Sequence, residues 1–258
     1  MNKKKVLSLL LNISSLMVFV VLWIILANKG GSMLPTPTET FSRFIDILTK
    51  PISKATLPLH IWVSLRRVLI AFAFAVFIGI SLGVGLGWGI KFNAFFGPVF
   101  EILRPIPPIA WIPMVILWFG IGEMAKVVIV FIGAFIPIVL NTSAGIKAID
   151  PLLISAGKIL GASKRQLLFD VALPATVPAI LAGIRTALSG GWMCVVAAEM
   201  VVARQGVGFL IVRGQEIGDT ALIVVCMLTI GVVSALLSTI LTKLEGVLCP
   251  WQFSETKL

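Results

Sequence analysis

The feature that most constrains this chain is a series of long stretches without a charged side chain. Five stretches of about 18 to 23 residues contain no Asp, Glu, Lys, Arg or His: residues 6–28, 68–90, 105–122, 127–146 and 220–242. A helix needs about 20 apolar residues to cross a hydrocarbon core of about 30 Å, because each residue rises about 1.5 Å. A sixth stretch, residues 177–202, is apolar except for Arg185 and Glu199. The sequence therefore predicts an all-α, polytopic transmembrane helical bundle of about six spans.

The charge content supports a membrane protein and argues against a nucleic-acid partner. Only 12% of the residues are charged, whereas a soluble domain carries about 25%. The net charge is +10, but basic residues in a membrane protein hold loops at the cytoplasmic face. The triplet Lys3, Lys4 and Lys5 therefore places the N-terminus inside the cell. Membrane lipid is the expected surrounding, and no nucleic acid is expected to bind.

The N-terminal region can be interpreted as a signal peptide or as an uncleaved first span. The apolar run extends to Ala27, which is longer than the apolar core of a signal peptide, and no small-x-small cleavage site precedes Lys29. These observations favour an uncleaved helix. The following segment, residues 40–48, has Phe41 and Phe44 at helical spacing and predicts an amphipathic helix, either on the outer membrane surface or packed on the domain. We divide the chain into residues 1–62, a core of residues 63–245 and a cytoplasmic tail of residues 246–258.

The sequence offers no catalytic or metal site. The three cysteines are far apart, His60 is the only histidine, and no Cys/His metal spacing occurs. The phosphate-binding pattern GxxxxGK[ST] is absent as well. We therefore expect no enzyme activity and no cofactor bound by this chain.

Two of the predicted spans carry local packing signals. Gly79, Gly83 and Gly87 recur every four residues, a spacing that lets two helix backbones approach closely. The third stretch opens on a proline-rich segment, residues 105–108, and contains Pro113. Because proline frees backbone carbonyls, this broken helix is expected to face protein or a water-filled cavity.

The most informative segment is the polar loop of residues 149–176 between the fourth and fifth spans. Asp150 is placed to cap a helix that begins at Pro151. Leu152, Leu153, Ala156, Ile159 and Leu160 form one apolar stripe, and Gly161 supplies a helix stop. Ser163 can cap a second short helix through about residue 169, and Pro174 and Pro178 are expected to break the chain again. By itself, this pattern fits an interfacial loop that only connects two spans.

This loop resembles the signature loop of binding-protein-dependent transport permeases, called the EAA loop. The family pattern is Glu-Ala-Ala, three residues, Gly, nine residues and Ile-x-Leu-Pro. Here Ser155-Ala156-Gly157 takes the place of the triplet, Gly161 that of the glycine, and Val171-Ala172-Leu173-Pro174 that of the end. The spacing matches throughout, while Ser155, Gly157 and Val171 depart from the pattern. Because Ser155 replaces the glutamate, any ionic contact made through that glutamate is in doubt.

The resemblance extends along nearly the whole chain to the nitrate, taurine, alkanesulfonate and bicarbonate branch of these permeases. It is carried by Ser64-Leu65-Arg66-Arg67-Val68, Leu103-Arg104-Pro105-Ile106-Pro107, Trp118-Phe119-Gly120-Ile121-Gly122, Gly183-Ile184-Arg185, Ala197-Ala198-Glu199-Met200 and Gly206-Val207-Gly208.

The resemblance implies a type I ABC importer permease in the inner membrane of a prokaryote. It implies a homodimer that works with two cytoplasmic ATPase subunits, which use ATP and Mg, and with an extracytoplasmic solute-binding protein. The loop then forms coupling helices that dock in a groove of the ATPase. The residues assigned to this coupling are Asp150, Pro151, Leu153, Ser155, Ala156, Gly157, Ile159, Leu160, Gly161, Ala162, Leu173 and Pro174.

The solute pathway is less well defined by the sequence. Arg185 and Glu199 are the ionisable residues most embedded in an apolar span, and such residues are often functional. They lie 14 residues apart, so a straight helix separates them by about 21 Å and they cannot pair directly. Each is either part of the translocation path or a structural residue paired elsewhere. Trp192 either lines the path together with Met193 or lies at the membrane interface, where Trp is often found.

Two other classes of protein remain as alternatives. A secondary transporter or channel would need no ATPase partner and often contains inverted repeats, of which the sequence shows no sign. A membrane enzyme would need clustered carboxylates, a metal set or a nucleophile with its base. The import permease is therefore the favoured interpretation.

Overall fold

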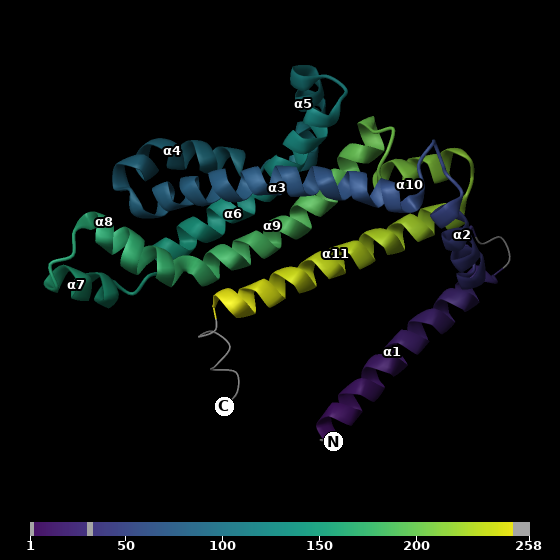
Figure 1. Cartoon of the computed structure of the whole chain (residues 1–258), viewed down its shortest axis with the longest axis horizontal. Helices are drawn as coiled ribbons and strands as arrows, with labels where there is room; N and C mark the ends of the chain where they lie inside the picture. The colour runs from purple at the N-terminus through teal and green to yellow at the C-terminus, as the bar shows by residue number, and fades with distance from the viewer. Residues whose placement is uncertain (1–2, 30–32, 250–258) are drawn as a thin grey trace.

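The computed structural model describes residues 3–29 and 33–249, and in this part of the chain every regular element is a helix. Four long helices run along the longest axis of the molecule (Figure 1): α3 (Leu57–Trp88), α6 (Glu123–Lys147), α9 (Leu173–Val202) and α11 (Thr220–Leu248). The short helices α2 (Pro37–Thr49) and α10 (Val207–Glu216) lie at one end. At the other end lie α7 (Pro151–Ile159) and α8 (Lys164–Gln166).

The centre of the bundle is α6, which packs against α3 on one side and α9 on the other. A Cβ atom at Gly79 would lie 3.0 Å from Ile138, one at Gly83 2.6 Å from Thr142, and one at Gly87 2.8 Å from Ile146. These distances are shorter than ordinary van der Waals contacts, so only glycine allows the observed approach of α3 to α6. The close approach predicted from the glycine spacing is confirmed.

The number of spans agrees approximately with the prediction. Four helices are long and apolar enough to cross a membrane, and a bent helix pair would make a fifth. The first helix, α1 (Lys3–Ala27), adds a shorter apolar helix over Leu11–Ala27. A count of six is reached only if α1 and the bent pair each count as one span.

The third predicted span differs most from the expectation. The chain does not begin this span at Pro105: it turns at Gly89 and returns along α3 as α4 (Ile90–Leu103). The 3₁₀-helix η1 (Pro108–Trp111) and α5 (Ile112–Phe119) follow, and the two halves are bent by 89°. The proline-rich segment between them supplies the break, because proline cannot continue the backbone hydrogen bonding of a helix.

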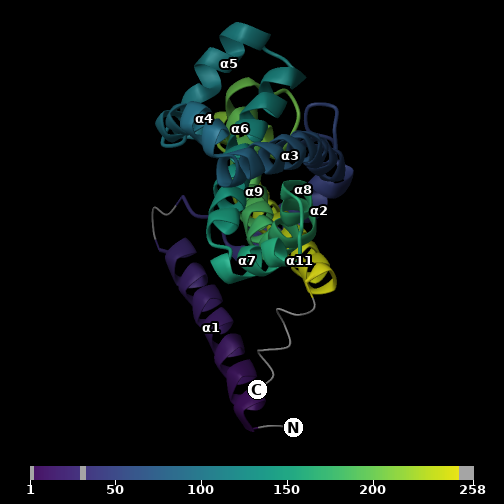
Figure 2. The ribbon, with the colours of Figure 1, turned by 90° about the vertical axis from the view of Figure 1, so that its left-hand side faces the viewer.

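The two N-terminal helices differ in how they contact the bundle. Most side chains described in α1 are exposed, and α1 lies apart from the other helices in both views (Figures 1 and 2). In contrast, α2 packs on α11 and α10 through Ile47, which is 1% exposed. Arg43 also donates a hydrogen bond to Asp219 at 2.7 Å. The predicted amphipathic helix is thus present, and of its two proposed locations it takes the one on the domain.

Two expectations about chain breaks are wrong. The helix after Ser163 does not stop near residue 169, because α8 continues through the π-helix η2 (Leu167–Ala172) into α9. Pro174 lies in the first turn of α9, where its missing N–H is not needed. Pro178 lies inside the helix without ending it. In the region expected to form the tail, α11 continues to Leu248, and residues 250–258 lie outside the described part.

The α3–α6 contact yields a first prediction. Gly83→Ala places a methyl group 3.0 Å from the Val139 carbonyl oxygen as well as against Thr142, and overpacking of this kind typically costs about 1–3 kcal/mol. We expect a lower melting temperature of the purified protein in detergent. The matched control is Gly231→Ala in α11, where an added Cβ meets nothing within 4 Å. Equal melting temperatures of the two variants would contradict this account of the packing.

Candidate functional site

The loop between α6 and α9 is built as its sequence predicts. The Asp150 carboxylate accepts a hydrogen bond from the Leu152 N–H at 2.8 Å, and Pro151 lies in the first turn of α7. Gly161 has a φ of +81°, a left-handed conformation that favours glycine, just after α7 ends. Ser163 and Gln166 cap each other's backbone at the start of α8. The predicted pair of short helices joined by a glycine is therefore present.

The first helix of this loop rests on the chain that leads into α9. A Cβ atom at Gly157 would lie 2.6 Å from Cδ2 of Leu167 in η2. Since α8, η2 and α9 follow one another without a break from Lys164 to Val202, α7 is held against the base of one 39-residue helical segment. A displacement of α7 would therefore act directly on a membrane-spanning helix.

The outer face of α7 is apolar and uncovered. Leu152 is 72% exposed, Ile159 85% and Leu160 87%. Leu153 and Ala156 of the predicted stripe are exposed too. Figure 2 views the molecule from the end where α7 lies. The apolar stripe thus presents large side chains at an extremity of the bundle, where the chain itself does not bury them.

A buried network of ion pairs lies near the opposite end of the bundle. Arg67 of α3 donates to Glu199 of α9 at 2.6 Å and binds both carboxylate oxygens of Glu123 at the start of α6, at 2.8 and 2.7 Å. The Arg67 and Glu199 side chains are 3% and 0% exposed. Glu199 also accepts hydrogen bonds from the Ser64 hydroxyl and the Gly208 N–H. Three spanning helices and the start of α10 are thereby joined by two carboxylates and one guanidinium.

The loop before α10 closes against this network. Gly206 has a φ of +128°, and a Cβ atom at this position would overlap the Glu199 carboxylate. The Gly206 N–H donates to Nδ1 of His60, so the other ring nitrogen, 3.2 Å from the Ile52 carbonyl oxygen, carries the proton. The sequence motifs around residues 64–68, 197–200 and 206–208 therefore meet at one place, which their separation along the chain did not reveal.

The structure places the other predicted pathway residues in different surroundings. Arg185 pairs with Glu245 of α11, a partner that sequence reasoning did not identify. Trp192 is 2% exposed and packs between α3 and α6, whereas Met193 is 71% exposed. Arg185 and Glu199 do not pair with each other, as expected from their spacing. Of the four, only Met193 and Arg185 have side chains open to the surroundings of this chain.

Comparison with known proteins now identifies the family. Residues 75–251, more than half of the chain, match the family described as "binding-protein-dependent transport system inner membrane component". The taurine transport system permease protein TauC of Escherichia coli is 33% identical, with 93% of this chain and 89% of the relative covered. This chain belongs to that family. It is an ABC importer permease and a multi-pass membrane protein, and such a permease is not itself catalytic.

Other relatives of the permease carry the names of different solutes. The nitrate import permease protein NrtB of a Synechocystis species is 31% identical over 90% of this chain and 86% of the relative. Permeases of Bacillus subtilis and Synechococcus elongatus, named for aliphatic sulfonates and bicarbonate, are 29% and 31% identical. Solved structures of the MetNI methionine ABC transporter in inward-facing conformations match with a TM-score of 0.64 at 22% identity, over 74% of this permease and 95% of that chain. This likeness shows the type of fold.

The ion network yields a second prediction. Arg67→Met leaves Glu199 buried without its cation, a change that typically costs about 3–5 kcal/mol. We expect a large fall in the melting temperature of the purified permease. The control is Arg66→Met, one residue earlier. The Arg66 side chain is 54% exposed, and its nearest approach to the Glu123 carboxylate is a long 3.9 Å. An exposed pair of this kind contributes less than about 1 kcal/mol. If both variants melt alike, the network does not hold the helices together as described above.

Proposed function

We propose that this permease forms the translocation path for a small oxyanion, such as a sulfonate, taurine, nitrate or bicarbonate, in the inner membrane of a prokaryote. Two copies form a homodimer with two cytoplasmic ATPase subunits, and an extracytoplasmic binding protein delivers the solute. The ATPases bind ATP and Mg, and this chain binds no cofactor. The relatives named for taurine, nitrate, sulfonates and bicarbonate support this class of solute.

The exposed apolar face of α7 is the observation that carries the proposal. Leu153, Ile159 and Leu160 lie at the extremity of the bundle, and their exposure is costly in water. An amphipathic helix that lies in an apolar groove is a recurring mode of recognition. The ATPase supplies this groove in our proposal, so that α7 is buried only in the assembled transporter.

The connection between α7 and α9 supports a mechanical role for the loop. When ATP draws the two ATPases together, their grooves move and carry α7 with them. Gly157 packs directly on Leu167, so this movement passes to the base of α9. Because the ATPase and the solute favour different conformations of the permease, hydrolysis and transport are coupled.

Ala156→Asp tests the docking face and is the third prediction. A carboxylate in the apolar contact must lose its hydration, which we expect to weaken binding of the ATPase by about tenfold or more. The measurement is co-purification of the full permease with its ATPase subunit, together with ATP-driven uptake in proteoliposomes. The control, Lys158→Gln, changes the net charge of α7 by the same amount but lies off the apolar stripe. If Ala156→Asp binds the ATPase as well as the wild type does, docking through this face is excluded. If the wild-type permease transports without any ATPase, the alternative of a secondary transporter is favoured.

Gly161→Pro tests the shape of the loop and is the fourth prediction. Proline cannot adopt a φ of +81°, and the substitution removes the hydrogen bond from the Gly161 N–H to the Lys158 carbonyl oxygen. We expect normal insertion in the membrane but loss of solute-stimulated ATP hydrolysis. Lys164→Pro serves as the control proline in the same loop, because Lys164 is the first residue of α8, where the missing N–H is not needed, and Ser163 before it is extended. Coupled transport at the normal rate in Gly161→Pro would count against a fixed loop geometry.

A further inference from the structure

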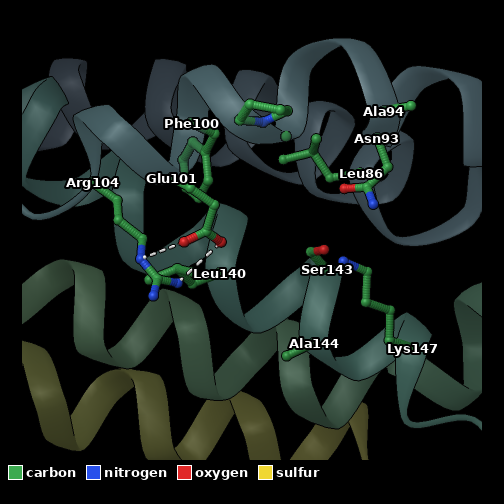
Figure 3. A pocket seen from close by; sticks show the side chains of 12 residues that line it. Leu86, Asn93, Ala94, Phe100, Glu101, Arg104, Leu140, Ser143, Ala144 and Lys147 are labelled. Atoms are coloured by element: carbon green, nitrogen blue, oxygen red, sulfur yellow. Dashed lines mark hydrogen bonds and ion pairs between the residues drawn. The ribbon is translucent and has the colours of Figure 1, made fainter.

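We propose that the cavity between α4, the end of α3 and the end of α6 binds a small oxyanion, with Lys147 as its principal cation. The identification of this anion with transported solute rests on the function proposed above. The cavity has a volume of about 510 Å³, which lies in the usual range for small-molecule sites. Its lining comes from the end of α3, from α4 and from the end of α6, and Figure 3 shows the lining side chains. In Figure 1 the turn between α3 and α4 lies toward the end of the bundle that carries α7.

Because α4 runs back along α3, the cavity that it lines extends from the end of the bundle toward its middle. Because the chain turns at Gly89 and returns along α3, Arg104 lies 14 residues beyond Ile90. At about 1.5 Å per residue, this places Arg104 about 20 Å along α4 from the α7 end. Lys147, in the last turn of α6, lines the same cavity nearer that end. The cavity therefore connects the end of the bundle with a charged residue deeper in it.

The charges that line the cavity favour an anion. Arg104 pairs with Glu101 at 3.1 Å, so these two residues nearly neutralise each other. Lys147 lines the cavity too, and in the described part of the chain no carboxylate forms an ion pair with it. The lining therefore carries one net positive charge, which comes from a side chain that lacks a counterion. Lys147 is exposed, and its positive charge at the mouth of the cavity can attract an anion.

Two uncharged polar side chains extend the same site. Asn93 of α4 and Ser143 of α6 both line the cavity, and neither side chain forms a hydrogen bond among the described residues. Figure 3 shows the Asn93 amide and the Lys147 ammonium on the side of Ser143, with the Glu101–Arg104 pair at the other end. An ammonium, an amide N–H and a hydroxyl together provide the donors that a sulfonate, nitrate or bicarbonate accepts.

Lys147 and Asn93 also line an adjoining space of about 380 Å³ that reaches Trp88 and Ile90 at the turn between α3 and α4. The anion site is thus continuous with the surface of this end. In the proposed transporter it is a cationic contact of the solute near the end of the bundle that carries α7, before release beside the ATPases. A single accessible lysine suits this step, because release requires weak binding.

Saturation-transfer NMR on the methyl protons of methanesulfonate tests this site with the full-length permease in phosphatidylcholine nanodiscs. We expect a signal that nitrate displaces and that tetramethylammonium of similar size does not. Lys147→Gln removes the cation and is expected to weaken binding about tenfold, whereas Lys147→Arg retains it. Lys243→Gln, an exposed lysine near the C-terminal end of α11, is expected to bind like the wild type.

Three results would overturn the proposal: no displaceable signal, equal binding by Lys147→Gln and the wild type, or equal losses from Lys147→Gln and Lys243→Gln. Nanodiscs that contain phosphatidylglycerol separate a free anion from a lipid phosphate, and loss of the methanesulfonate signal there would assign Lys147 to the lipid headgroup instead. The assay uses no ATPase, so its failure is distinct from failure of the proposed function. Normal ATPase binding by Ala156→Asp would refute the docking face and leave the anion site intact.

Discussion

The close approach of α3 to α6 is the constraint on which the rest of the structure depends. Inside a membrane, apolar side chains gain little by leaving lipid for protein, so helices associate through tight packing of small residues. Gly79, Gly83 and Gly87 provide this packing against one face of α6. On the other face, a Cβ atom at Gly145 would approach Ala179 of α9 to 2.5 Å. With α6 fixed between α3 and α9, both functional ends of the bundle are positioned by the same three helices.

The helices are held together by different kinds of interaction at the two ends of the bundle. Near α10, Arg67 and Glu199 form a buried pair, and removal of Arg67 would leave the charge of Glu199 uncompensated. Near α7, the contacts are van der Waals contacts of Gly157 with Leu167, while the large apolar side chains face outward. The buried ion pair is costly to separate, so the helices near α10 are expected to keep their relative positions. The arrangement near α7 leaves surface available to a partner, which suits an element that must follow the movement of another subunit.

Local signals explain how much of this could be predicted from the sequence. The cap at Asp150, the stop at Gly161 and the stripe from Leu152 to Leu160 depend on neighbouring residues, so they were predicted correctly. The continuous helix through Pro174 and Pro178 was missed because a π-helical turn before α9 has no clear sequence signal. The turn at Gly89 was missed because hydropathy gives the length of an apolar run and not the direction in which the chain continues.

Ion pairs between residues far apart in the chain could not be predicted from the sequence either. Glu199 could be recognised as unusual in an apolar span, but its partner Arg67 lies 132 residues away and in another helix. The same holds for Arg185 and Glu245. Once these partners are known, an ionisable residue in the bundle can be judged by whether its charge is compensated. Glu199, Arg185 and Arg104 each have an opposite charge beside them, and Lys147 has none among the described residues. A cation without a counterion next to a cavity is a stronger indication of a ligand than position within a span. We therefore propose an anion site near the end of the bundle that carries α7, and not at the buried network.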